Sequence, residues 1–135
     1  MKIPFLGGRS ENPGTRDAEG IAELLAECEL LRSHASRSGV ELDDTEASLE
    51  ALDQLVPGWR DDEDVLLWLG NDAGLYLGTV IVRTVPGAAW ELRSDGQPVI
   101  RLESGREFDV VAAGHEWAGS GVPELSQLYA EVAEE

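Results

Sequence analysis

Cations are scarce in this sequence. Its 135 residues include only ten Lys and Arg, against 27 Asp and Glu, so the formal net charge is −17. Affinity for nucleic-acid phosphates comes mainly from cationic side chains, and anionic membranes attract polybasic segments. We therefore expect neither direct binding to DNA or RNA nor adsorption to an anionic membrane surface.

Cysteine is nearly absent, and long uncharged apolar runs are missing. The single cysteine, Cys28, excludes an intramolecular disulfide framework. The first eight residues contain too few apolar side chains for a secretory signal. The most apolar window, 65–82, contains Asn71 and Asp72, and a central Asp is costly in a bilayer. We expect a buried helix here rather than a membrane span, in a cytoplasmic protein with a reduced thiol.

The length and composition fit one domain with a hydrophobic core. Hydrophobic residues make up 42% of the chain and charged residues 27%. Residues 1–16 lack periodicity and carry three cations against one acid, so this segment is +2 and the remainder is −19. We predict a flexible N-terminal tail over 1–16 and a single domain over 17–135. The apolar patch Ile3–Leu6 could dock on the domain or on a partner.

Three segments show the apolar spacing of three and four residues that predicts an amphipathic helix. The first covers 17–38, including Cys28 on its apolar stripe, and is expected to end before a glycine. The second covers 45–56 and is expected to end at Pro57. The last covers 123–134, with a proline at its first position.

The segment 62–84 has two interpretations. Apolar residues recur through it at helical spacing, and the acids at 61–64 suit a first helical turn. The run 79–85, by contrast, has high strand propensity because it is rich in β-branched residues. We favour one long buried helix. The alternative is a helix to about Gly74 followed by a strand.

The residues after this segment predict a small sheet. Apolar and polar residues alternate over 88–111, Asp95-Gly96 is a strong hairpin signal, and a second turn falls at Ser104-Gly105. The segment 112–121 is expected to be a loop or a short helical turn. The predicted fold class is α+β, with three helices, then a three-stranded antiparallel meander, then a C-terminal helix.

Two tryptophans and three glycines are candidate partner-binding residues. Trp59 and Trp117 fall in expected loops, where they could form an exposed anchor for a partner or plug the ends of the core. Gly70, Gly74 and Gly78 would line one face of a helix, at a cost in helix propensity. Such a face predicts close packing against another element, or a seat for a ligand or a partner helix.

The acidic run Asp61–Asp64 contributes three more candidates, Asp61, Asp62 and Asp64. Carboxylates suit a hard cation, but the run lacks the spacing of a calcium loop and equally suits a helix start facing water. His115-Glu116 lacks the second histidine of a zinc helix. Nucleotide-binding and nucleophile-elbow motifs are also missing, so we predict no catalytic residue, cofactor or metal.

Short patterns in the middle of the chain carry a family resemblance. The chain contains SLEALD at 48–53, GLYLG at 74–78 and then Trp90. This combination resembles a family of small uncharacterised bacterial proteins, actinobacterial in type, over residues 40–115. The resemblance implies that the Gly-x-Tyr-Leu-Gly segment is helical and leads into a short antiparallel sheet. It implies no reaction and supplies no catalytic residues.

Three functions fit these observations. The leading hypothesis is a non-catalytic acidic binding or regulatory module for a protein partner, and a basic partner would be steered by the charge. The second is a structural subunit that self-associates through the glycine-lined helix face. The third is a metal-assisted enzyme that uses paired carboxylates. Candidates for those carboxylates are Asp61, Asp62, Asp64, Asp72 and Glu116.

Overall fold

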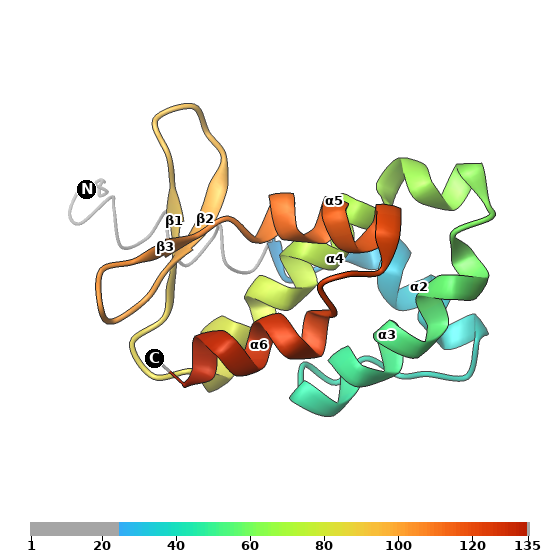
Figure 1. The fold of residues 1–135 in the computed structure, drawn as a ribbon, viewed down its shortest axis with the longest axis horizontal. Helices are drawn as coiled ribbons and strands as arrows, with labels where there is room; N and C mark the ends of the chain where they lie inside the picture. The colour runs from blue at the N-terminus through green and yellow to red at the C-terminus, as the bar shows by residue number, and fades with distance from the viewer. Residues whose placement is uncertain (1–24, 135) are drawn as a thin grey trace, which may run out of the picture.

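The computed structural model describes residues 25–134 of the chain. In this range the fold is α+β, as predicted: three helices lead into a three-stranded antiparallel sheet, and two helices follow (Figure 1). The predicted tail, 1–16, and the first part of the predicted helix 17–38 lie outside the described residues. The elements are α2 (Glu29–Arg37), α3 (Glu46–Trp59), α4 (Glu63–Thr84), β1 (Ala89–Leu92), β2 (Pro98–Arg101), β3 (Glu107–Phe108), α5 (Val110–Ser120) and α6 (Leu125–Ala133).

The segment 62–84 was predicted to be either one long helix or a helix followed by a strand. It forms one continuous helix, α4, so the favoured prediction is confirmed. Its beginning is fixed by Asp62, whose side chain accepts hydrogen bonds from the N–H groups of Asp64 and Val65 at 3.0 and 3.4 Å. The β-branched residues near its end remain helical because tertiary burial outweighs their strand propensity. At 22 residues α4 is about 33 Å long, and it runs from the helical end of the molecule to the sheet (Figure 1).

The segment 112–121 was predicted to be a loop or a short helical turn, but all of it except Gly121, the C-cap, belongs to the 11-residue helix α5. Its cap is Asp109, whose Oδ1 accepts a hydrogen bond from the N–H of Ala112 at 3.0 Å. The expectation was wrong because the glycines of this segment lower helix propensity, while the packing that stabilises the helix comes from elsewhere in the chain. The fold therefore has two helices after the sheet, not one.

The backbones of α4 and α5 lie in direct contact. A Cβ atom added to Gly114 of α5 would overlap the carbonyl oxygen of Gly70 and the backbone of Gly74. A Cβ added to Gly74 would overlap the backbone of Val110 and Val111 at the start of α5. These glycines therefore set the separation of the two helices, because any side chain at the contact would force the backbones apart.

The predicted meander is confirmed, with the strand order β1-β2-β3 and antiparallel pairing throughout. Trp90, Ile100 and Phe108 stand opposite one another across the three strands. Ile100 is fully buried, and the ring of Trp90 covers Gly78 of α4. One face of the sheet is thereby joined to the end of the long helix.

The other face of the sheet carries a ladder of opposite charges. Arg101 bonds Glu91 on β1, with Nη2 2.9 Å from Oε2, and its guanidinium lies 3.5 Å from Glu107 on β3. Arg93 lies 3.7 Å from Glu107 and 3.4 Å from Asp109. These pairs are exposed and individually weak, so their main effect is to neutralise this face locally.

The first helix is shorter than predicted, because the chain turns at residues 26–28 before α2 begins. Arg32 donates hydrogen bonds to the carbonyl groups of Ala26 and Glu27, at 2.8 and 2.9 Å. Cys28 has a left-handed backbone, with φ of 39°. The Arg32 side chain thus binds carbonyl groups that would accept backbone hydrogen bonds in a continuous helix. The predicted continuous helix is therefore wrong within the described residues.

The boundaries of the helices near the prolines also differ from the prediction. α3 begins after its cap Thr45 and continues through Pro57 to Trp59, where the prediction ended it at Pro57. Burial of Trp59 against the core fixes this last turn despite the proline. α6 begins at Leu125, whereas the prediction began it at Pro123. The backbone of its N-cap, Glu124, is extended rather than helical.

One carboxylate joins three helices. Oδ1 of Asp53 on α3 accepts hydrogen bonds from the indole Nε1–H of Trp117 at 2.9 Å and from the N–H of Leu125 at 2.8 Å. Its Oδ2 accepts from the N–H and the hydroxyl of Ser126, at 3.1 and 2.6 Å. Asp53 therefore supplies the cap that α6 lacks from its own residues and holds α5 in place through Trp117.

Of the described helices, α4 is long and apolar enough to cross a membrane by length and composition alone. Within the fold, 61% of its most apolar window is buried. It contacts α2, α3, α5, α6 and the sheet, so its surroundings are those of a core helix.

The helix contact predicts opposite effects of one substitution at two glycines of α5. Gly114→Ala should lower the free energy of unfolding by about 2–3 kcal/mol, because the added methyl group overlaps the backbone of α4. Gly119→Ala meets no atom within 4 Å and should raise it by about 0.5–1 kcal/mol, through helix propensity. Urea unfolding followed by tryptophan fluorescence measures both, and equal stability of the two variants would contradict the contact.

Candidate functional site

The two tryptophans predicted in loops both lie on helices and are buried. Trp59 closes α3, and its ring packs edge-on against His34, with ring centroids 4.6 Å apart. Trp117 lies on α5, has no exposed surface and is bonded to Asp53. The hypothesis of an exposed tryptophan anchor is therefore wrong, since both rings fill the core.

The glycine-lined face is covered from within the chain. Gly70 and Gly74 contact α5, and Gly78 contacts the ring of Trp90. All three residues are buried. This arrangement confirms close packing as the reason for the glycines, and it leaves no exposed glycine face on α4 to seat a second copy.

The acidic run lies at the exposed corner between α3 and α4. We call Asp61, Asp62, Glu63 and Asp64 the acidic corner; all four residues are exposed. Asp62 caps α4, while the other three form no hydrogen bond through their side chains and no ion pair with any residue from 25 to 134. Acids in a first helical turn are favoured by the helix dipole, but three further carboxylates exceed what a cap requires.

An exposed leucine continues the acidic corner along α4. Leu67 is 84% exposed, more than any other large hydrophobic residue that the structure describes. It lies three residues after Asp64 and four after Glu63, so all three side chains share one helix face. Leu67 could not be identified from the sequence because it lies inside the run 66–69, where only the exact phase of the helix shows which leucine faces water.

The carboxylates proposed for an enzyme are not gathered into one site. No group of three His, Cys, Asp or Glu side chains within residues 25–134 is placed to hold a metal ion. Asp72 is about 12 Å along α4 from Asp64, and Glu116 is exposed on α5. Burial raises the pKa of Asp72 above its ordinary value, and the N–H of Leu31 opposes this by bonding its Oδ2 at 3.2 Å. Asp72 thus acts within the described structure as an acceptor for the first turns of α2.

A second polar cluster joins α2, α3 and α4 around Asp44. Arg32 and Arg83 both pair with its carboxylate, at 3.0 and 3.2 Å. The hydroxyl of Tyr76 accepts a hydrogen bond from the N–H of Asp44 at 2.8 Å and shares another with the hydroxyl of Ser48 at 2.7 Å. The network satisfies the buried tyrosine hydroxyl and fixes the loop before α3, which is a structural role.

Cys28 is a buried thiol in an unreactive setting. Its Sγ–H donates to the carbonyl of Leu25 at 3.2 Å. Burial, reinforced by the negative charge of Asp72, raises the pKa of Cys28 from 9.0 to about 12. A reactive cysteine needs a lowered pKa, so this thiol is structural.

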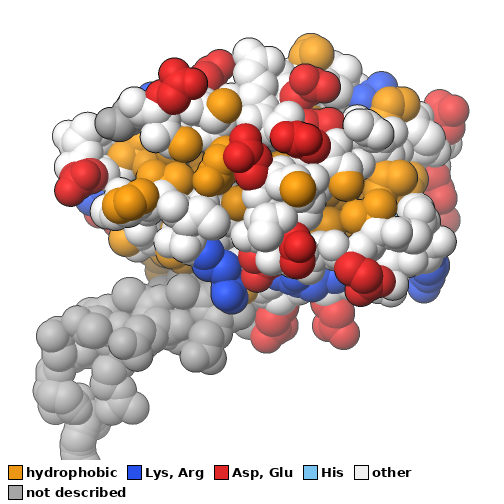
Figure 2. All heavy atoms as spheres, turned by 90° about the horizontal axis from the view of Figure 1, so that it is seen from below, with side chains coloured by type: hydrophobic (Ala, Val, Ile, Leu, Met, Phe, Trp, Pro, Cys, Tyr) orange, Lys and Arg blue, Asp and Glu red, His pale blue; other side chains and the backbone are white. Residues whose placement is uncertain are grey.

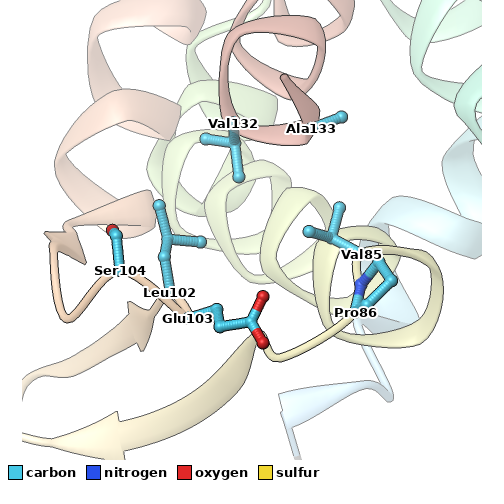
Figure 3. Close-up of a pocket in the computed structure, with 7 residues that line it drawn as sticks. All are labelled: Val85, Pro86, Leu102, Glu103, Ser104, Val132 and Ala133. Atoms are coloured by element: carbon cyan, nitrogen blue, oxygen red, sulfur yellow. The ribbon is translucent and has the colours of Figure 1, made fainter. Parts of the chain in front are cut away.

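A pocket of about 350 Å³ opens where the β2–β3 turn meets the ends of α4 and α6 (Figure 3). Leu102 and Val132 point toward one another from the two sides, and the carboxylate of Glu103 lies between Leu102 and Pro86. Glu103 is exposed and, within residues 25–134, has no ion-pair partner. The pocket is lined by Val85, Pro86, Leu102, Glu103, Ser104, Val132 and Ala133.

The surface around α6 and α3 is mixed rather than uniformly acidic. Figure 2 shows this side of the molecule, with acidic side chains spread among patches of apolar ones. A surface of this kind combines long-range attraction for cations with short-range apolar contact area.

Comparison with known proteins gives a family without a function. A sequence model of the family of unknown function DUF6278 matches residues 1–135. The chain matches no curated protein and no solved structure. The features that bear on function are therefore those of the surface described above.

The raised pKa of Cys28 predicts slow alkylation of the folded protein. At pH 8, reaction with iodoacetamide should be at least roughly a hundredfold slower than for the same protein in urea, because burial suppresses the thiolate. Mass spectrometry of quenched samples measures the rate. Alkylation of the folded protein at the rate of the unfolded one would contradict the buried setting.

Proposed function

The chain belongs to the family of unknown function DUF6278, and we propose that it is a non-catalytic module that binds a basic protein partner. The observation that supports the proposal is that the exposed side chain of Leu67 lies on the same face of α4 as carboxylates of the acidic corner. Together they offer a partner both negative charge and an apolar contact on one helix face.

The charges favour a cationic partner. Four of the described arginines, Arg32, Arg83, Arg93 and Arg101, are already paired with acids of the same chain. The acidic corner has no such pairing within residues 25–134, and its field adds to that of a protein with a net charge of −17. A basic surface would be attracted over roughly a Debye length, and association would slow as salt is raised.

Leu67 supplies the short-range part of the binding energy. Burying a leucine side chain against a partner contributes about 2 kcal/mol. This is comparable to the binding free energy that is lost when an interface hot-spot residue is truncated. Its neighbours Glu63 and Asp64 would surround it with charge-assisted hydrogen bonds to Lys or Arg. The resulting partner surface is basic, with an apolar recess for one side chain.

The first test neutralises the acidic corner while keeping the helix cap. Tagged wild type and the triple variant Asp61→Asn, Glu63→Gln, Asp64→Asn are used to capture proteins from native lysate at about 50 and 300 mM salt, a range over which screening changes strongly. We expect wild type to retain a basic partner at the lower salt, and we expect the triple variant to lose it. Mass spectrometry identifies and quantifies the captured protein.

A second triple variant controls for net charge. Glu29→Gln, Glu46→Gln and Glu116→Gln remove the same number of exposed acids, two of them also from first helical turns. This variant should retain the partner as wild type does. Equal loss in both triple variants would mean that net charge, rather than the corner, determines binding. Retention by the corner variant would overturn the proposal.

The second test removes the apolar contact without changing charge. Leu67→Ser should leave the free energy of unfolding within about 0.5 kcal/mol of wild type, because the side chain is 84% exposed. The variant should bind the captured partner at least roughly tenfold more weakly, which is the loss expected for one buried leucine.

A matched control is Leu92→Ser, which removes another exposed apolar side chain, 46% exposed, from β1 in the sheet. Isothermal titration calorimetry with the purified partner gives the two dissociation constants. Unchanged affinity of Leu67→Ser, or equal weakening by Leu92→Ser, would exclude Leu67 from the interface.

A further inference from the structure

The pocket at the β2–β3 turn is built for an apolar side chain accompanied by a cation. Leu102 and Val132 are almost fully buried and form apolar walls, and Val85 is half-buried beside them. Glu103 stands at the rim without an ion-pair partner from residues 25–134 (Figure 3). A volume of about 350 Å³ lies at the low end for ligand pockets and suits one or two side chains.

The chain itself contains a segment of matching chemistry. Its first six residues place Lys2 directly before the apolar patch Ile3–Leu6. Residues 1–16 carry a net +2, whereas the rest of the chain is strongly negative, so the segment is attracted to the body of the protein. The family model matches the chain from residue 1, so this segment falls within the region shared with the family.

The connection between segment and pocket is long enough. Twenty-four residues precede Leu25, and a chain of that length can extend over about 80 Å, while a globular protein of this size has a radius of gyration of about 14 Å. A tethered segment also has an effective concentration in the millimolar range, so weak contacts suffice to dock it.

We propose that Met1–Leu6 docks in this pocket of the same chain, with Phe5 against Val85 and Ala133 over the buried Leu102 and Val132, and with Lys2 beside Glu103. The inference does not depend on partner binding at the acidic corner, which uses other residues. The docked segment covers an apolar hollow next to the C-terminal helix and neutralises an exposed carboxylate.

The direct test is nuclear magnetic resonance of the full chain. We expect nuclear Overhauser effects between the ring protons of Phe5 and the methyl groups of Val85, Leu102 and Val132. Their absence under native conditions overturns the proposal. A mixture of differently labelled copies distinguishes contacts within one chain from contacts between two chains. Nuclear Overhauser effects seen only between copies would mean that a second chain fills the pocket, which would also overturn the proposal.

A filling substitution tests the same contact from the pocket side. Ala133→Phe places a ring at the pocket from an exposed position and should abolish the effects of Phe5 by occupying its space. Ala47→Phe adds the same ring at an exposed position near the start of α3 and should leave them unchanged. Persistence of the effects in Ala133→Phe shows that Phe5 does not lie in this pocket.

A charge exchange tests the cation. Lys2→Glu alone and Glu103→Lys alone should each lower the docking equilibrium constant about two- to fivefold, the range measured for exposed ion pairs. The double variant should recover docking to within about twofold of wild type, because the pair is restored with opposite polarity. Additive losses in the double variant contradict the pairing of Lys2 with Glu103. Glu103 is exposed, so its substitution preserves folding.

Discussion

Gly70, Gly74 and Gly114 bring the backbones of α4 and α5 into direct contact, and the other elements are positioned from that contact. α5 begins two residues after β3 ends, so its position on α4 also places the sheet. Near its other end, Trp117 carries the bond to Asp53 that fixes α3 and α6. The glycine contact between α4 and α5 therefore positions the sheet at one end of α5. At the other end of α5 it positions α3 and α6.

The elements that could be predicted from the sequence are those specified by local chemistry. The start of α4 was readable from the acids around Asp62, and the meander was readable from alternation and from the Asp95-Gly96 turn. α5 was not readable, because its residues are apolar on most sides and rich in glycine, which indicates a loop when no partner helix is known. The early end predicted for α3 failed for a similar reason: local rules stop a helix at Pro57, while burial of Trp59 extends it.

The candidate site was predicted only in part. The acidic corner was found as a run of four residues, since adjacency in sequence survives folding. The tryptophans were misassigned because their exposure depends on which element they occupy, and the phase of α4 was needed to show that Leu67 faces water. The pocket beside Glu103 combines three separate segments, and no local pattern in the chain marks it.

The distribution of charge along α4 has a consequence for how the molecule turns in solution. At one end of this helix the sheet balances much of its charge internally, through the ladder of Arg93 and Arg101 with their acids. At the other end, the acidic corner has no such compensation among the described residues (Figure 1). The molecule therefore carries more uncompensated negative charge at the acidic corner than at the ladder of the sheet, where two arginines offset three acids. In the field of a cationic surface it experiences a torque before contact, which rotates the α3–α4 end forward and shortens the rotational search that precedes docking.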